Sequence, residues 1–308
     1  MKKIFPILIL GLTTFACSLF SSPASTPTPE AIPATQIVST PTPSVPALTA
    51  DQLKNAQYQL VVQDSHATVQ LTNGVYQTTG DSASPDYKNI TVIDQMAFGD
   101  LNGDGASDAA VLLTENYGGS GVFVSVVAVL NQNGQPVQAA AETVDDRPRI
   151  NSLSIQNGVI TLDAVIHGPN DPGCCAAQPI KESYRFVAGK LVFSSISMTT
   201  ANGQDRLLTI DSPAEGSPVS SPLTVTGKVT IAPFENNLLY VVFDANNNEI
   251  THGSFLVNAD QPGGPGTFSL PLDLSSASVS GPVRIQIEDS SPADGSILAL
   301  ASVIVNIK

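Results

Sequence analysis

Residues 151–166, NSLSIQNGVITLDAVI, carry the pattern that decides the fold. Two short apolar runs, 153–155 and 159–166, stand on either side of Asn157-Gly158. Asn-Gly favours the left-handed backbone of a two-residue hairpin turn, so the two runs are predicted to pair as antiparallel strands.

The same signal recurs along residues 51–200. Asn73-Gly74 is predicted to join strands 67–72 and 75–77, and Asn133-Gly134 to end a buried strand at 122–130. Further on, 184–186 and 191–193 are predicted to pair across residues 188–190. One short helix, about 50–57, is expected from the capping box that Thr49 and Gln52 can form.

Composition agrees with a mainly β protein outside the cytoplasm. The chain has 308 residues, enough for two ordinary domains, and its short Val/Ile/Leu runs are separated by turn residues. With 13 Lys and Arg against 27 Asp and Glu, the net charge is −14. Nucleic acids and anionic lipid surfaces require basic patches, so neither is an expected partner.

Residues 1–16 have the features of a signal peptide. Lys2 and Lys3 precede an apolar run, 4–12, that is too short to span a bilayer as a helix. The following Ala16-Cys17 resembles the bacterial lipobox, although Thr14 and Phe15 depart from its preferred residues. The resemblance implies that Cys17 becomes the acylated first residue, and two or more acyl chains anchor a protein durably. Ordinary secretion with an idle Cys17 is the alternative.

Residues 17–50 are expected to form the lipidated Cys17 and a disordered tether. Positions 18–50 hold seven prolines and a single charge, Glu30. Such a segment buries too little apolar surface to offset its ordering entropy. An extended tether would lift a folded body away from a membrane. A glycosylated stalk fits the same composition.

Residues 100–108, DLNGDGASD, are the most informative stretch for a site. Oxygen ligands recur at alternate positions with a glycine at the sixth, as at the start of a calcium-binding EF-hand loop. The bidentate Glu of that loop is absent, so the final Asp is expected to close the site. The predicted calcium ligands are Asp100, Asn102, Asp104, Ala106 through its carbonyl, and Asp108. A metal-free, Asx-rich turn is the alternative.

This shorter loop resembles the calcium loops of integrin-type FG-GAP repeats, with Phe98-Gly99 as the lead-in. In those repeats the loop joins two strands, and the apolar flanks 92–98 and 109–113 agree with that arrangement. The resemblance implies a calcium ion with a structural role. Because the motif occurs once, a propeller of repeated blades is not expected.

Cys174 and Cys175 are neighbours in the chain. Consecutive Cα atoms lie about 3.8 Å apart, closer than in most disulfides. Three interpretations remain open: a vicinal disulfide that stiffens a loop, two buried or intermolecular thiols, and a metal or redox site near His167. In an oxidising compartment, pairing or protection of the thiols is expected.

Four motifs in residues 56–195 resemble an uncharacterised module of bacterial envelope lipoproteins. They are the loop at 100–108, Gly118-Gly119-Ser120-Gly121, Asp146-Arg147, and Asp171-Pro172 before the cysteine pair. The resemblance implies export and no assigned activity.

Residues 207–308 are predicted to form a second module. About seven short strands suggest an aligned β-sandwich. The ordered motifs SPAEGSPVSSPLTVTG at 212–227, FENN at 234–237 and DGS at 294–296 resemble the Gmad2 family of bacterial spore germination. That resemblance implies an immunoglobulin-like interaction or spacer domain without catalytic residues. Phe234 is expected to pack at a strand edge, and Asp294-Gly295 to form a hairpin turn.

Two functions follow from these patterns. The first is a lipid-anchored, non-enzymatic protein at the cell membrane or cell surface, stabilised by calcium and binding an envelope or surface partner that the sequence does not name. The alternative is a cell-wall-modifying hydrolase with a site near Asp108, Asp146 and Cys174. The three histidines are far apart, and no nucleophile motif such as Gly-x-Ser-x-Gly occurs. These facts favour the first function.

Overall fold

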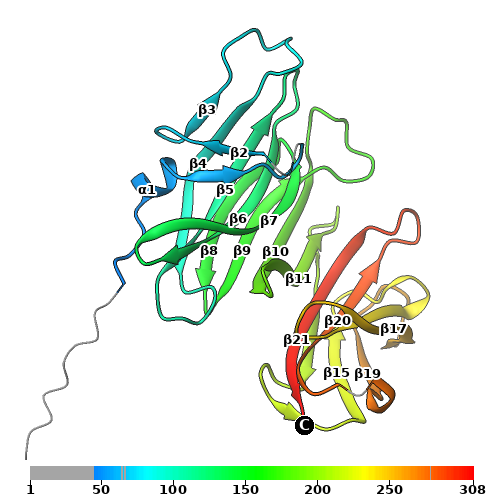
Figure 1. Ribbon diagram of the computed structural model, residues 1–308. Coiled ribbons are helices and arrows are strands. Elements are labelled where there is room, and N and C mark those ends of the chain that lie inside the picture. Colours follow the sequence, from blue (N-terminus) through cyan, green and yellow to red (C-terminus); the bar gives the residue numbers. More distant parts are fainter. Residues whose placement is uncertain (1–44, 64, 66, 278) are drawn as a thin grey trace, which may run out of the picture. The chain divides into compact units, whose positions relative to one another are not determined.

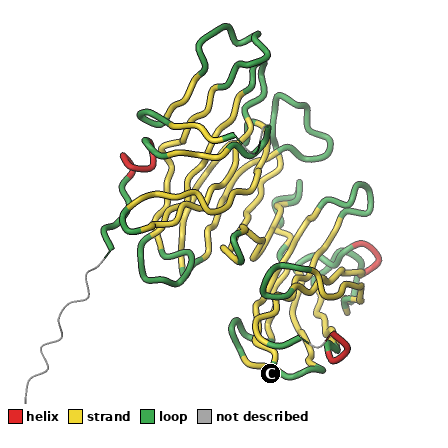
Figure 2. The backbone as a smooth tube through the Cα atoms, viewed as in Figure 1, coloured by secondary structure: helices red, strands yellow, loops and turns green. Residues whose placement is uncertain are grey.

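A computed structural model describes residues 45–308, except for 64, 66 and 278. The predicted signal peptide, Cys17 and most of the tether therefore lie outside the described residues. Strands dominate the described chain (Figures 1 and 2), which confirms the prediction of a mainly β protein. Among the described residues, no helix has the length and apolar composition needed to cross a bilayer.

The folded body begins before residue 50, inside the stretch expected to be tether. Leu48 is buried, and the side-chain amide of Asn131 donates a 2.8 Å hydrogen bond to the carbonyl of Pro46. Helix α1 (Ala50–Lys54) starts at the predicted capping box, in which Thr49 and Gln52 satisfy each other's backbone N–H groups. The helix is shorter than expected because the chain turns at Asn55 and enters a strand.

The first module is built on a five-stranded antiparallel sheet in the order β3-β4-β5-β6-β7. Its central strand, β5, has a continuous buried run from Asp108 to Leu113 because both faces of the sheet are covered. One face packs against α1 and the hairpin of β1 and β2, and the other against a second sheet. The bounds are β1 (Gln57–Gln59), β2 (Thr68–Gln70), β3 (Val75–Gln77), β4 (Asn89–Gly99), β5 (Asp108–Asn116), β6 (Phe123–Gln132) and β7 (Gln135–Asp146).

The second sheet of this module contains β8 (Arg149–Gln156), β9 (Val159–Ile166), β10 (Gln178–Val187) and β11 (Lys190–Thr199). Leu162 of β9 and Tyr184 of β10 are fully buried in the core between the two sheets, opposite Leu112 and Val126. Burial of such side chains is the main favourable term in joining the sheets.

The hairpins predicted at Asn157-Gly158 and at residues 188–190 are confirmed, as is the turn predicted at Asn133-Gly134. β8 and β9 pair across Asn157-Gly158, β6 and β7 across Asn133-Gly134, and β10 and β11 across Ala188-Gly189. At Asn73-Gly74 the predicted turn forms, with positive φ angles at both residues, but the pairing across it stops at the single bridge between Thr72 and Val75. β2 pairs instead with β1, and β3 with β4, because the two short runs belong to different layers.

The second module is the predicted sandwich of two sheets. One sheet has the order β13-β15-β19-β18, and the facing strands are β17-β16-β20-β21. Val225 and Phe268 from the first sheet meet Leu238, Ile285 and Val303 from the second in a common core. The bounds are β12 (Asp205–Arg206), β13 (Leu208–Ser212), β14 (Pro218–Val219), β15 (Leu223–Val229), η1 (Phe234–Asn236), β16 (Asn237–Phe243), β17 (Glu249–Leu256), β18 (Asn258–Ala259), β19 (Gly266–Leu272), η2 (Ser275–Ala277), β20 (Gly281–Ser290) and β21 (Ile297–Ile307).

Strand pairing continues from one module into the other. β11 pairs with β21 through Ser195–Ser197 and Ala299–Ala301, which makes one sheet run from β17 to β8. Leu300 of β21 is fully buried in the core between the sheets of the first module. The short β12 also pairs with β11, and its Arg206 forms a 2.5 Å ion pair with buried Asp289 of β20. Side chains of the second module therefore complete the packing of the first.

Candidate functional site

The predicted calcium loop joins β4 to β5, as expected for a loop between two strands. Asp100 directly follows β4, and its two carboxylate oxygens accept hydrogen bonds from the N–H groups of Gly103 and Gly105, at 2.7 and 2.9 Å. Both glycines have positive φ angles, 79° and 83°, which a side chain would strain. The loop thus curls around the Asp100 carboxylate.

Asp104 lies at the exposed tip of the same loop. It accepts from the backbone N–H of Ala106 at 2.7 Å and from the side-chain amide of Asn102 at 2.9 Å. These two bonds favour the ionised carboxylate and lower the pKa of Asp104 from its usual value. Both hydrogen bonds therefore favour a negative charge where a cation could approach from solvent.

Asp108 differs from the other acids of the loop because it is fully buried. One oxygen accepts from the backbone N–H of Leu101 and the other from the backbone N–H of Asn131 on β6, both at 2.8 Å. The side chain thus ties both ends of the loop to the sheet. This bracing role was not predicted from the sequence, which offered Asp108 only as a metal ligand.

The calcium assignment stays a prediction. Within the described residues, no three His, Cys, Asp or Glu side chains gather closely enough to hold a metal ion. The residues nevertheless suit a hard cation, because they are oxygen donors and a carboxylate oxygen that accepts one N–H keeps a free lone pair. In the described geometry these carboxylates are engaged by N–H groups of the loop and the sheet.

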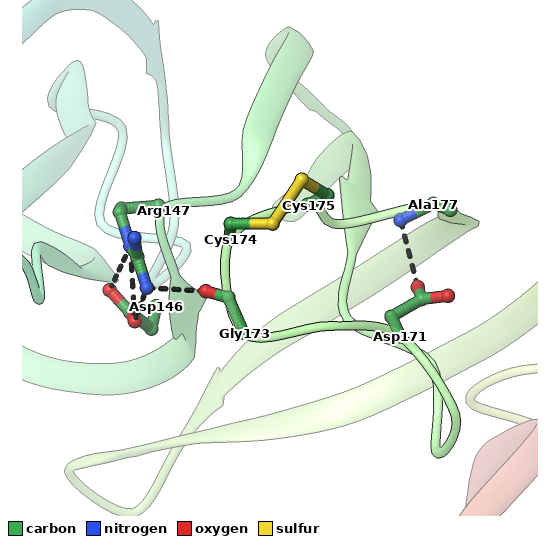
Figure 3. Close-up of a disulfide and its surroundings, with 7 residues drawn as sticks. All are labelled: Asp146, Arg147, Asp171, Gly173, Cys174, Cys175 and Ala177. Atoms are coloured by element: carbon green, nitrogen blue, oxygen red, sulfur yellow. Dashed lines mark hydrogen bonds and ion pairs between the residues drawn. A yellow bond between two sulfur atoms is a disulfide. The ribbon is translucent and has the colours of Figure 1, made fainter.

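The cysteine pair lies in the loop between β9 and β10, where the structure joins Cys174 to Cys175 by a disulfide (Figure 3). Both residues are exposed. One oxygen of Asp171 accepts from the N–H groups of Gly168 and Ala177, each at 2.8 Å, and so closes the base of the loop. Backbone donation to the carboxylate lowers the pKa of Asp171.

Arg147 fixes the other side of this loop. Its guanidinium donates to the carbonyl of Gly173 at 2.5 Å and pairs with Asp146 at 2.7 Å (Figure 3). Asp146 also accepts from the backbone N–H of Val122, at 2.7 Å, just after the Gly118–Gly121 turn. Three of the four sequence motifs noted in residues 56–195 therefore meet at one end of the first module.

The fourth motif, the loop at 100–108, lies at the opposite end. In the strand register, Asp146 of β7 pairs with Phe123 of β6, and Phe123 pairs with Glu115 of β5. Glu115 is seven residues further along β5 than Asp108. At about 3.3 Å per residue this separates Asp108 from Asp146 by roughly 20 Å. The structure brings Asp146 near the cysteine loop but places Asp108 far from both. The three residues proposed for a hydrolase do not form one site.

Sequence reasoning missed a group of ionisable side chains between the two sheets. Glu182 is buried and accepts a hydrogen bond from the hydroxyl of Tyr184, which is also buried. Burial, with smaller contributions from Glu142 and Asp145, raises the pKa of Glu182 to about 7. Asp145 in turn bonds the ring of His167 at 2.8 Å. The alternation of apolar and polar residues along the strands did not predict this group, because Glu182 occupies an inward position where an apolar residue is expected.

In the second module one minor expectation failed and another held. Phe234 is 63% exposed and does not pack at a strand edge, because Glu235 and Asn236 have positive φ angles and turn the chain away. Asp294 lies in the turn between β20 and β21, where it accepts from the N–H and the hydroxyl of Ser296. The predicted turn at Asp294-Gly295 is confirmed.

Comparison with known families agrees with this sandwich. Residues 207–296 match Gmad2, the immunoglobulin-like domain of bacterial spore germination. The match confirms the resemblance of the second module, here called the Gmad2 domain, and its immunoglobulin-like fold. It covers neither the first module nor the leader.

Other comparisons are less informative. A search of curated protein sequences finds no match to this chain. A similar solved structure is the extracellular domain of BT4673 from B. thetaiotaomicron, at 7% identity and a TM-score of 0.18. That alignment covers 77% of this chain and 44% of the other, so this chain spans less than half of its length. A likeness this weak carries no argument about function.

Proposed function

We propose that this chain is a lipid-anchored protein on the extracytoplasmic side of a bacterial membrane, where it acts as a non-enzymatic binding or structural module. The observation that carries the proposal is the Gmad2 match over residues 207–296. An immunoglobulin-like sandwich presents edges and loops for contact, and this one follows a leader that ends at a lipobox-like Cys17.

The anchor is supported by the sequence on both sides of Cys17. The preceding apolar run has the length of a signal peptide, and the proline-rich segment that follows suits a spacer between a membrane and a folded body. Acyl chains on Cys17 would provide the membrane affinity. The acidic chain, with a net charge of −14, would gain little from binding anionic lipid directly.

Calcium is the cofactor that we propose for the first module. Asp100, Asn102 and Asp104 supply side-chain oxygens from one loop, Ala106 can add its carbonyl, and Asp108 ties the loop to the sheet. A calcium ion would offset the repulsion between these carboxylates and stiffen the connection between β4 and β5. Its role is structural.

Two measurements on the full-length protein in bacteria test the proposed anchoring and location. In cells supplied with an alkyne analogue of palmitate, the protein should become labelled, and a Cys17→Ser variant should not. A protease added to intact cells should degrade the protein while a cytoplasmic marker survives. If an outer cell layer keeps the protease out, spheroplasts take the place of intact cells. Absence of label on the wild-type protein, or protection from the protease in spheroplasts, would contradict the proposal.

A further inference from the structure

Strand β17 forms one end of the long sheet in the Gmad2 domain. It pairs with β16 on one side, and no strand of the described chain pairs with its other side. From Thr251 to Leu256 its register with β16 runs without a shift. An edge of this kind exposes a row of backbone N–H and C=O groups that can accept another strand.

The other sheet edges of the described chain are shorter, irregular or covered. β3 and β18 are three and two residues long, and β13 has a register shift between Ile210 and Ser212. The pairing of β7 shifts twice, and its Gln138 exchanges hydrogen bonds with Gln59. β8 has a shift after Ile150, and its Ile155 packs against Gly99 of β4. The six-residue run of β17 is the longest unshifted edge in the described chain.

The outward face of β17 and β16 is apolar at one end. Leu256 is 69% exposed and Leu239 is 37% exposed. Leu256 of β17 pairs with Asn237 of β16, and Leu239 is two residues after Asn237 on the same strand. Because side chains alternate between faces, the two leucines project from the same face as diagonal neighbours. Phe234, 63% exposed, stands in the turn just before β16. Leu256 and Leu239 therefore form an apolar patch beside a free edge, and Phe234 is a further exposed apolar residue close to it in the chain.

The opposite face holds the edge strand in place. Phe255 of β17 packs with its ring 6.3 Å from that of Tyr240 and 5.5 Å from that of Phe268, within the sandwich core. Tyr240 also covers Gly253, since an added Cβ there would come within 2.8 Å of the tyrosine ring. The edge is therefore a preorganised template rather than a loose segment.

Acidic groups lie near the two ends of β17 and are here called its acidic rim. Glu235 follows Phe234, Glu249 starts β17, and Asp260 comes just after β18; all three are exposed. The basic side chain of β17 is His252, which already contacts Glu249 at 2.6 Å. Two copies joined edge to edge would bring these acids together in a chain whose net charge is −14. A partner with basic side chains fits this rim better than a second copy.

We propose that the free edge of β17 is a docking site for an extended polypeptide segment that alternates apolar and basic residues. The segment would add as a further strand to the sheet, with its backbone bonded to β17 and its apolar side chains against Leu256 and Leu239. Its basic side chains would face the acidic rim. This inference rests on the proposed binding role of the Gmad2 domain and names its partner class.

The test uses the full chain with Cys17→Ser, so that the protein can be purified without detergent. The probe is a short peptide of alternating Lys and Val, and its affinity is measured by calorimetry at physiological ionic strength. A matched control peptide has the same sequence with N-methyl groups on alternate residues, which removes backbone donors but keeps the charge. Leu256→Ser removes the most exposed leucine, and Val75→Ser, at a 42% exposed position of β3, is its control.

We expect the parent peptide to bind and the N-methylated peptide to lose binding. Leu256→Ser should weaken binding of the parent peptide by about fivefold or more, and Val75→Ser should leave it unchanged. Equal binding of both peptides would show charge attraction alone and overturn the proposal. The proposal would also be overturned if the parent peptide did not bind, or if Leu256→Ser had no effect on binding. Self-association of the chain that Leu256→Ser abolishes would overturn it as well. None of these results depends on lipidation, so the docking site can fail while the membrane anchor stands.

Discussion

Asp108 accepts a 2.8 Å hydrogen bond from the backbone N–H of Asn131, a residue 23 positions later in the chain. This contact joins the first residue of β5 to the next-to-last residue of β6, while the second oxygen of Asp108 accepts a hydrogen bond from the N–H of Leu101. The last acid of the candidate calcium loop is therefore a brace between the loop and the sheet even without metal, whereas Asp100 and Asp104 accept hydrogen bonds from within the loop.

Asp108→Asn should destabilise the protein in calcium-free buffer. One carboxylate oxygen becomes an NH₂ group that faces a buried N–H donor, which should lower the free energy of unfolding by about 1–3 kcal/mol. Asp104→Asn, at an exposed position, should change it by less than about 0.5 kcal/mol under the same conditions. Urea unfolding with excess EDTA measures both. Equal effects of the two substitutions would contradict the bracing role.

Calcium should raise the melting temperature of the wild-type chain, because a ligand that binds only the folded state stabilises it by mass action. Asp104→Asn removes one charged ligand, so its melting temperature should rise less at the same calcium concentration. Thermal melts in millimolar calcium and in EDTA provide the comparison, with magnesium as the control cation. If calcium does not shift the wild-type melt, the loop is a metal-free turn.

Glu182 should make stability depend on pH near neutrality. Its pKa is about 7 in the folded protein against 4.5 for the ordinary side chain, chiefly because of burial. A raised pKa means that the stabilising contribution is complete below about pH 4.5 and is lost as the pH rises through about 7, a difference of roughly 3 kcal/mol.

The matched variant is Glu182→Gln, which keeps the acceptor for Tyr184 but cannot ionise. Chemical unfolding of both proteins between pH 4.5 and 8 should show the wild type losing stability relative to the variant. Parallel curves for the two proteins would mean that Glu182 titrates normally.

Leu300→Ala should weaken both modules. Leu300 belongs to β21 of the Gmad2 domain but is buried in the core of the first module, so the cavity should cost about 2–5 kcal/mol. Hydrogen exchange should accelerate in β10 and β11 as well as in β20. As the control, Val225→Ala creates a cavity inside the Gmad2 core alone. Faster exchange confined to the Gmad2 domain in Leu300→Ala would show that the modules unfold separately.

Replacing both Cys174 and Cys175 by serine should change stability by about 1 kcal/mol or less. A disulfide between neighbours closes the shortest covalent loop and so removes little entropy from the unfolded chain. Alkylation of the unreduced protein should leave both residues unmodified, and prior reduction should expose them to the reagent. Labelling without reduction would show free thiols.

Local signals in the sequence predicted much of the fold. Asn157-Gly158 and Asn133-Gly134 placed two hairpins correctly because a two-residue turn and alternating flanks act over short distances. Asn73-Gly74 shows the limit: the turn forms there as predicted, but the turn signal cannot say which layer each flanking run joins.

Long-range contacts could not be predicted. The pairing of β11 with β21 joins residues about 100 positions apart, and no local pattern specifies it. The meeting of Asp146, Arg147 and the cysteine loop likewise depends on how β7 and β9 come together. The buried Glu182 was missed because a carboxyl at an inward position contradicts the alternation used to find strands.

Membrane retention is the sharpest test of whether the protein is held at a membrane through Cys17. Membranes from cells that express the wild-type chain or Cys17→Ser are washed with high salt and alkali, and the protein in each fraction is quantified by immunoblot. The wild type should stay in the washed membranes until detergent is added, whereas Cys17→Ser should appear in the soluble extracytoplasmic fraction. Release of the wild type by the washes, or equal retention of the variant, would contradict anchoring through Cys17.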